Sequence, residues 1–148
     1  MLPERKRLSH EIPGWVRDEC RFFVTINCKQ RGVDSLCCTG LAATLMASVA
    51  IYENLGKWYV PAFVVMPDHV HLIATFARQY GIGPTIRAWK GFHAKHSGIA
   101  WQSGFFEHRL RDDAEFTQKL DYVRMNPVRK GYVSDWKDWP HAIIHGDW

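Results

Sequence analysis

The sequence predicts an α+β fold, a single antiparallel sheet with helices packed on it. Strand-like segments alternate with helical segments in the order strand, helix, strand, strand, helix, strand, helix. Two of these strands are separated only by the tight-turn sequence "MPDH", so they should pair as an antiparallel hairpin. A ferredoxin-like arrangement is the simplest fold that pairs strands in this order and covers the sheet with helices.

Four segments are expected to form the strands. Residues 20–28, "CRFFVTINC", are rich in β-branched and aromatic residues, as strands are. Residues 57–66 and 69–76 give the hairpin, with Pro61 at an edge or a bulge. A short strand is expected over 105–110.

Two helices are expected before the last strand. Residues 38–55 carry Ala, Leu and Met at helical spacing, and Gly56 follows as a stop. The second helix is expected over 85–96, with Pro84 near its start, where the missing amide hydrogen costs nothing.

A third helix is expected from Asp113 to about Asn126. Asp112 is a suitable N-cap, and Glu115 follows three residues later, as in a capping box. Pro127 disfavours helical geometry for the residue before it, so the helix should end there.

The chain of 148 residues predicts one domain, residues 1–148, with a Trp-rich tail, 132–148, that packs back on it. No apolar stretch reaches the roughly 20 residues that a membrane span needs, and no signal peptide is visible. Four cysteines without a CxxC motif indicate reduced thiols, and a structural zinc site has little support from their spacing.

Positive charge is concentrated in one part of the chain. The net charge is +4, but residues 78–130 hold ten Lys and Arg against five acids, so this segment carries +5 and the remainder −1. Aromatic residues lie between these charges, an arrangement that suits a phosphate backbone and stacked bases. A solvated helix face explains the charge alone equally well.

The apolar strand 69–76 contains His69 and His71. Side chains alternate across a strand, so both imidazoles point to one face and could share a divalent ion. The alternative is two hydrogen-bonded histidines on a half-buried strand. Metal binding is favoured because burying two imidazoles without partners is costly.

A second candidate pair lies on the last predicted helix. Tyr122 and Asn126 are four residues apart and share a helix face. Tyrosine can act as a covalent nucleophile, and an Asn carbonyl oxygen is a suitable ligand for Mg²⁺. The alternatives are a packed tyrosine and an asparagine that caps the helix.

The sequence "MPDHVHLI", followed about fifty residues later by "YVRMNPVRKGYV", resembles the single-tyrosine transposases named HUH after their His-hydrophobic-His motif. The closer resemblance is to the REP-associated tyrosine transposase subgroup. The segments "HEIPGWV", "FFVTINCKQR", "WQSGFFEHRLR" and "DWPHA" also resemble segments of that subgroup, so the resemblance covers nearly the whole chain.

This resemblance implies a metal-dependent single-stranded DNA endonuclease and strand transferase that acts on hairpin-forming palindromic repeats. His69 and His71 would be metal ligands for Mg²⁺ or Mn²⁺, and Tyr122 the nucleophile that forms a 5′-phosphotyrosine intermediate. Asn126 would be the third ligand, at a position where relatives often carry Gln. The expected location is the bacterial cytoplasm, in association with the nucleoid.

Four basic residues are candidates for contacts with DNA phosphates: Arg109, Arg111, Arg129 and Lys130. Asp68 is expected to cap the turn or to orient a ligand histidine, and His108 to contact DNA or to support Phe106. We expect a monomer in which Tyr122 acts within its own chain; a homodimer is the alternative. The competing functions are a catalytically inactive DNA-hairpin-binding protein and a phosphoesterase that uses water as its nucleophile.

Overall fold

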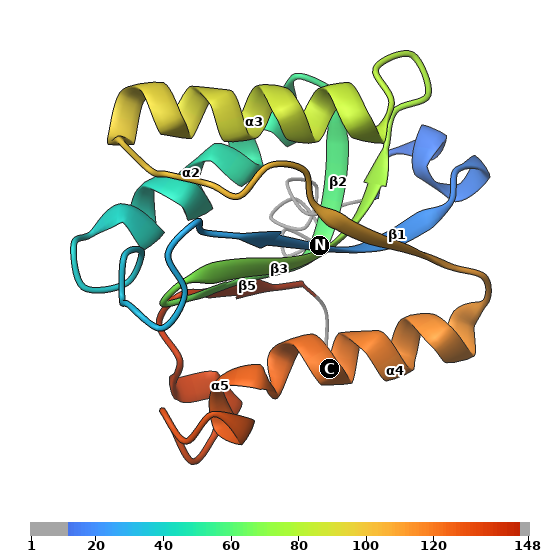
Figure 1. The fold of residues 1–148 in the computed structure, drawn as a ribbon. Helices are drawn as coiled ribbons and strands as arrows, with labels where there is room; N and C mark the ends of the chain where they lie inside the picture. Colours follow the sequence, from blue (N-terminus) through green and yellow to red (C-terminus); the bar gives the residue numbers. More distant parts are fainter. Residues whose placement is uncertain (1–11, 146–148) are drawn as a thin grey trace, which may run out of the picture.

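The computed structural model describes residues 12–145, and its elements are shown in Figure 1. The strands are β1 (Arg21–Asn27), β2 (Trp58–Met66), β3 (His69–Phe76), β4 (Phe106–Leu110) and β5 (Ala142–Ile144). The helices are α2 (Leu41–Asn54), α3 (Ile82–Ser97), α4 (Asp113–Arg124) and α5 (Asn126–Arg129), with 3-10 turns η2 (Gly14–Asp18) and η3 (Trp136–Asp138).

The five strands form one sheet in the order β4-β1-β3-β2-β5, and every neighbouring pair is antiparallel. The first four strands have the order of a ferredoxin-like fold, in which β3 lies between β1 and β2. The predicted α+β fold is therefore confirmed, as is the predicted order of its first seven elements.

Helices cover both faces of this sheet. Figure 1 shows α2 and α3 on one face and α4 with α5 on the other. Every residue of β3 is buried, because a central strand between two helical layers has no face in contact with water. This double burial explains why the sequence of β3 is largely apolar, with Thr75 and the two histidines as the exceptions.

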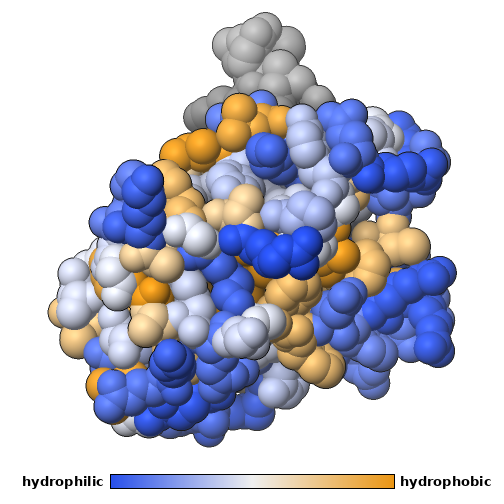
Figure 2. Space-filling view, turned by 45° about the horizontal axis from the view of Figure 1, so that its top comes forward, coloured by the Kyte–Doolittle hydropathy of each residue, from blue (hydrophilic) through white to orange (hydrophobic). Residues whose placement is uncertain are grey.

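Two hydrophobic clusters fill the layers. The first lies between the sheet and α2 and α3, around Trp58, Trp89 and Phe63. The second lies on the α4 face and joins Phe23 of β1 to Phe116 of α4. Figure 2, which views the α3 side of the molecule, shows a largely hydrophilic surface with hydrophobic side chains in separate small groups. No helix of the described part is long and apolar enough to cross a membrane.

The helix boundaries differ from the prediction in three places. Helix α2 begins at Leu41, after Gly40 with a φ of 81°, because the amides of Cys37 and Cys38 are bonded to the Asp34 carboxylate instead. Helix α3 begins three residues before the predicted start. The last helix divides after Arg124, and α5 follows with a proline in its first turn, where the missing amide hydrogen is tolerated.

The tail contains a strand that the sequence analysis missed. Strand β5 pairs with β2 at the edge of the sheet, and nearby the indole nitrogen of Trp139 donates to the carbonyl oxygen of Val65 at 3.0 Å. Trp148 and the start of "HEIPGWV" lie outside the described residues.

Candidate active site

His69 and His71 lie side by side at the turn end of β3, on the face covered by α4. Their ring centroids are 4.6 Å apart with an interplanar angle of 74°. Only 7% of His69 and 6% of His71 is exposed. The alternation along β3 has brought both rings to one face, as the sequence pattern predicted.

Each ring uses its Nδ1 atom for a hydrogen bond within the protein. His69 Nδ1 lies 2.8 Å from the Asp68 Oδ1 atom, and His71 Nδ1 lies 2.9 Å from Thr25 Oγ1. Thr25 is the register partner of His71 in β1, so the backbone ladder fixes that contact. No hydrogen bond joins either Nε2 atom to another residue of the described chain, so both Nε2 atoms remain available for a ligand.

Asp68 is itself held by the loop that follows β1. Arg31 Nε donates to Asp68 Oδ2 at 2.9 Å, and the backbone amide of Gly32 donates to the same oxygen at 2.8 Å. Burial acts to raise the pKa of Asp68, but the hydrogen bonds from Gly32, His69 and Arg31 outweigh it and hold that pKa well below its ordinary value. Asp68 is therefore a fixed anion behind His69.

Burial favours the neutral form of both histidines. Burial lowers the pKa of His69, and the neighbouring Asp68 opposes this only in part. Burial, with the positive charges of Arg129 and Lys119 adding to it, lowers the pKa of His71 to about 3. Neutral imidazole is the form that binds metal ions, so both side chains are ready to ligate at physiological pH.

Tyr122 lies on α4 next to this pair. Its ring centroid is 5.9 Å from that of His71 and 6.0 Å from that of Phe23, so the ring packs on the sheet. The residue is nevertheless 43% exposed. A tyrosine that is supported on one side and open on the other can meet a large substrate such as a nucleic acid.

Two cations flank the Tyr122 ring. The Arg129 guanidinium carbon is 4.3 Å from the ring centroid and the Lys119 Nζ atom 5.1 Å. Arg129 Nη2 also donates to the carbonyl oxygen of Tyr122. These charges are suited to binding a phosphate beside the phenol.

Asn126 begins α5, one turn before Lys130, which is close enough for its charge to act on His69. It is only 3% exposed, and its Oδ1 atom is buried without a hydrogen-bond partner in the described chain. A buried acceptor that lacks a partner is costly, which is consistent with a residue whose oxygen ligates a bound group.

The available donors could hold a divalent ion with an open coordination shell. Two imidazole nitrogens and one amide oxygen leave positions free for water and substrate oxygens, as Mg²⁺ and Mn²⁺ sites often do. Within residues 12–145 no group of three His, Cys, Asp or Glu side chains is arranged to hold a metal ion. A third protein ligand would therefore come from another residue type, and the unpartnered Oδ1 atom of Asn126 is the candidate that the sequence predicted.

The structure brings two of the four predicted DNA-contact residues to the site. Arg129 lies over Tyr122, and the charge of Lys130 acts on His69. Sequence reasoning missed Lys119 and Arg31, which are also close to the histidines. Lys119 could have been found, since it precedes Tyr122 by three residues and shares its helix face.

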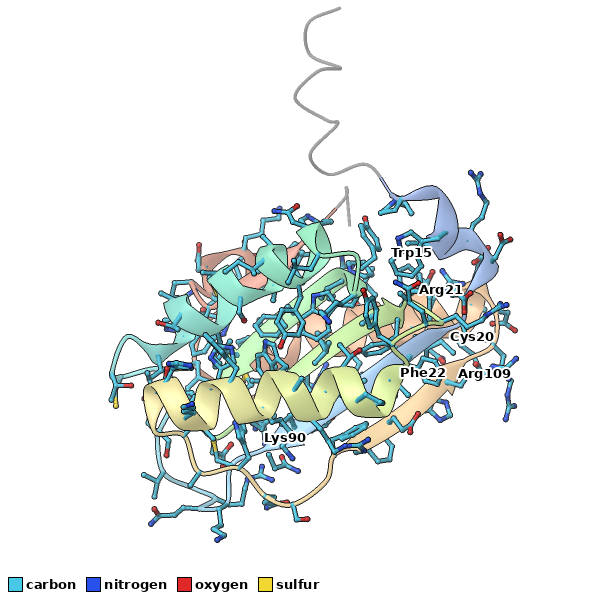
Figure 3. All side chains as sticks on the ribbon, turned by 90° about the horizontal axis from the view of Figure 1, so that it is seen from above. Trp15, Cys20, Arg21, Phe22, Lys90 and Arg109 are labelled. Atoms are coloured by element: carbon cyan, nitrogen blue, oxygen red, sulfur yellow. The ribbon has the colours of Figure 1, made fainter. Side chains whose placement is uncertain are left out.

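The other two predicted DNA-contact residues lie elsewhere. Arg109 pairs with Phe22, which belongs to the cluster on the α3 side, so it points to the face opposite the histidines (Figure 3). Arg111 follows β4, and its backbone amide donates to the Glu115 carboxylate at 2.6 Å. Their contact with DNA remains a prediction, but such contact would be away from Tyr122. His108 is exposed on β4, opposite Phe23.

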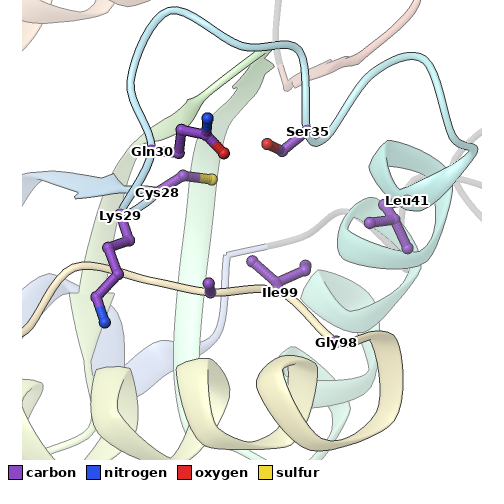
Figure 4. Close-up of a pocket in the computed structure, with 8 residues that line it drawn as sticks. Cys28, Lys29, Gln30, Ser35, Leu41, Gly98 and Ile99 are labelled. Atoms are coloured by element: carbon purple, nitrogen blue, oxygen red, sulfur yellow. The ribbon is translucent and has the colours of Figure 1, made fainter.

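A pocket of about 450 Å³ is lined by residues of the loop that follows β1, by Leu41 and by residues 98–100. In Figure 4, Cys28, Gln30 and Ser35 turn their polar atoms toward a space bordered by Leu41 and Ile99. Burial raises the pKa of the Cys28 thiol to about 11, so this thiol is not reactive at neutral pH. None of the predicted site residues lines the pocket.

Comparison with known proteins gives consistent relatives. A Haemophilus influenzae protein named for the REP-associated tyrosine transposases is 35% identical over 106 residues, which cover 58% of this chain and 58% of that protein. The Escherichia coli REP-associated tyrosine transposase is 28% identical over 131 residues, covering 85% of this chain and 77% of that protein. No protein-family model matches the chain.

Solved structures agree with the sequence relatives. A REP-associated tyrosine transposase bound to a REP hairpin superposes with a TM-score of 0.73 at 27% identity, covering 89% of this chain and 81% of the other. A transposase-related protein from Deinococcus radiodurans superposes with a TM-score of 0.52 at 18% identity, covering 76% of this chain and 94% of the other, which supports the fold alone.

The fold, with two histidines on a central strand and a tyrosine on the helix that covers them, resembles that of the single-tyrosine HUH transposases. Within that class, the chain is similar to the REP-associated tyrosine transposases in both sequence and structure, so the resemblance predicted from the motifs is confirmed.

Proposed function

We propose that the protein is a transposase that cleaves and rejoins single-stranded DNA at hairpin-forming palindromic repeats. The observation that carries this proposal is the position of Tyr122, 5.9 Å from His71 between ring centroids and open to solvent. The hairpin-bound relative supports hairpin DNA as the substrate. A protein that acts on such repeats would work at the bacterial nucleoid.

His69, His71 and Asn126 are the residues that would hold Mg²⁺ or Mn²⁺. Such an ion would polarise and orient the scissile phosphate when bound. Asp68 and Thr25 hold the two rings from behind, and burial keeps the rings neutral.

Tyr122 supplies the nucleophile. Its phenolic oxygen bonds to phosphorus and the bond from phosphorus to the 3′ oxygen breaks, which leaves a 5′-phosphotyrosine and a free 3′-hydroxyl. The phenolic proton must leave and the departing 3′ oxygen must gain one. Lys119 and Arg129 lie beside the ring, where they would stabilise negative charge on the phenolate and the phosphate.

The covalent step also accounts for strand joining. The phosphotyrosine retains the energy of the original phosphodiester bond, so another 3′-hydroxyl can attack it and release Tyr122. Hydrolysis by a water nucleophile would lose that energy and leave ends that cannot be joined directly.

The test is a covalent-adduct assay with labelled single-stranded hairpin DNA and Mn²⁺ or Mg²⁺. The wild-type protein should form a protein–DNA adduct that resists denaturation, and Tyr122→Phe should not. Tyr132→Phe is the matched control, since Tyr132 is also exposed but its ring stacks on Trp139 rather than packing against His71.

Two outcomes would favour the competing functions. Tight hairpin binding without cleavage under either ion would indicate an inactive DNA-binding protein. Cleavage that continues in Tyr122→Phe would indicate a water nucleophile.

A further inference from the structure

We propose that Thr25 is a positioning residue that, together with Asp68, fixes both site histidines in the tautomer whose Nε2 lone pairs face the cation site. The proposal rests on the proposed function only for the identity of the bound group. The hydrogen-bond pattern that carries it belongs to the chain itself.

The tautomer of His69 follows from its partner. A neutral imidazole carries one N–H and one lone pair, and a carboxylate can only accept hydrogen bonds. Asp68 is anionic, so at 2.8 Å the Nδ1 atom of His69 must carry the hydrogen. The Nε2 lone pair is then free. Arg31 and Gly32 hold the carboxylate in place, so the ring orientation is fixed as well.

The tautomer of His71 depends on its hydrogen-bond partner Thr25. The hydroxyl of Thr25 lies 2.9 Å from His71 Nδ1 and could either donate or accept. We assign it as the acceptor because Arg129 and Lys119 both lie over the Tyr122 ring, which packs against His71. A ring among cations is more stable when a lone pair, rather than an N–H, is open to the site.

The fold makes Thr25 a rigid support. Its backbone is locked opposite His71 by the β1–β3 ladder, and a β-branched side chain has few χ1 choices. The imidazole ring of His71 is also stacked on Phe23, which precedes Thr25 by two residues on β1; the two ring centroids are 5.4 Å apart. The imidazole of His71 is thus held by one residue against its face and another at its Nδ1 edge.

The first measurement is made on the full chain without metal or DNA. Long-range ¹H–¹⁵N correlation spectra of the histidine rings distinguish protonated Nδ1 from protonated Nε2. Both rings of the wild type should be protonated at Nδ1. Thr25→Val should shift His71 toward protonated Nε2 and leave His69 unchanged, whereas Thr25→Ser, which keeps the hydroxyl, should resemble the wild type.

The second measurement is the affinity for Mn²⁺ by calorimetry. Partners that orient metal-binding histidines typically contribute about 10–100-fold in affinity. We expect a loss in that range for Thr25→Val and near-normal binding for Thr25→Ser. Backbone amide spectra and the free energy of unfolding would show that both variants keep the fold.

The proposal is overturned if His71 of the wild type is protonated at Nε2. It is also overturned if the Thr25→Val protein keeps both the wild-type tautomer of His71 and the wild-type Mn²⁺ affinity. Because the tautomers are read in the metal-free protein, this failure is separate from failure of the proposed function. Failure of the proposed function would instead appear as a wild-type protein that does not bind Mn²⁺ or does not form the covalent adduct.

Discussion

Arg129 is fixed directly over Tyr122. Its guanidinium carbon lies 4.3 Å from the centre of the phenol ring, and its Nη2 atom donates to the backbone carbonyl of the same tyrosine. The residue reaches back from α5 to the last turn of α4, across the break at Met125. The contact therefore places a cation beside the candidate nucleophile.

Replacing Arg129 should slow cleavage more than it weakens binding. Loss of one preorganised donor to a developing negative charge typically costs about 10²–10³ in rate. We expect Arg129→Ala to lose adduct formation within that range in single-turnover assays. Arg129→Lys should be intermediate, because it keeps the charge but not the planar fork.

Arg87→Ala is the control for Arg129, since Arg87 is exposed on α3 on the other side of the sheet. If Arg129→Ala forms the adduct at the wild-type rate, Arg129 has no role in cleavage.

Lys119 is expected to contact a phosphate. It lies over both Tyr122 and Phe23, with Nζ 5.1 and 4.7 Å from the ring centres. Each phosphate contact that is lost reduces the salt dependence of binding by about one counterion. Lys119→Ala should therefore weaken hairpin binding and flatten its dependence on salt concentration, measured by fluorescence anisotropy from low to moderate salt.

Lys57→Ala is the matched control for Lys119, because Lys57 also lies over a tyrosine, Tyr80, with Nζ 4.0 Å from the ring centre. Identical salt slopes for Lys119→Ala and Lys57→Ala would contradict a phosphate contact at Lys119.

The parts of the site that follow from local periodicity could be predicted from the sequence. His69 and His71 share a face because strand side chains alternate. Tyr122 and Asn126 were expected on one helix, but the helix divides between them at Met125. Thr25 and Arg31 could not be predicted in this way. They reach the histidines through the register of β1 against β3 and through a loop folded over Asp68, and neither is encoded by a local pattern.

The same limit explains the errors in the fold. The sequence predicted helices on a sheet but not which face each helix covers, so the face on which Arg109 lies could not be predicted either. Strand β5 has three residues at a sheet edge, which is too short for a periodic signal. The end of α4 was predicted two residues late, because the helix divides after Arg124 and Asn126 begins the further short helix α5.

Tyr122 is expected to act within its own chain. Its ring packs on Phe23 and His71 of the same molecule, so the site is complete without a partner. Mixing Tyr122→Phe with His71→Ala should therefore restore no adduct formation. Restored activity in the mixture, with a dimer in light scattering, would instead show that α4 is exchanged between subunits.

The free energy of unfolding should decrease as the pH is lowered, because His93 is buried. Burial between α2 and α3 lowers the pKa of His93 to about 4, and its Nε2 atom lies 3.0 Å from Ser48 Oγ. His93 binds a proton near pH 6.5 in the unfolded chain, but only near pH 4 in the folded chain. The full stability is thus present above pH 6.5 and is lost progressively as the pH falls toward 4.

Urea unfolding at several pH values would measure this effect. One such group contributes a slope of at most about 1.4 kcal/mol per pH unit in that range. His93→Gln should reduce the slope, and His108→Gln, a change at an exposed histidine, should not. Equal slopes in all three proteins would exclude His93 as a source of acid sensitivity.

Asn126 offers a test that separates function from stability. Its buried Oδ1 atom has no hydrogen-bond partner in the described chain, and such an atom typically costs about 1–3 kcal/mol. If Asn126 has only a structural role, Asn126→Leu should change the free energy of unfolding and leave the Mn²⁺ affinity unchanged. If it is a ligand, Asn126→Leu should leave the free energy of unfolding equal or higher and lower the Mn²⁺ affinity by about tenfold or more.

Calorimetry and urea unfolding of the same samples would give both quantities. The control is Asn54→Leu at the exposed end of α2. Unchanged Mn²⁺ affinity in Asn126→Leu would limit the protein ligands to the two histidines, and the remaining coordination positions would then have to come from water and the DNA phosphate.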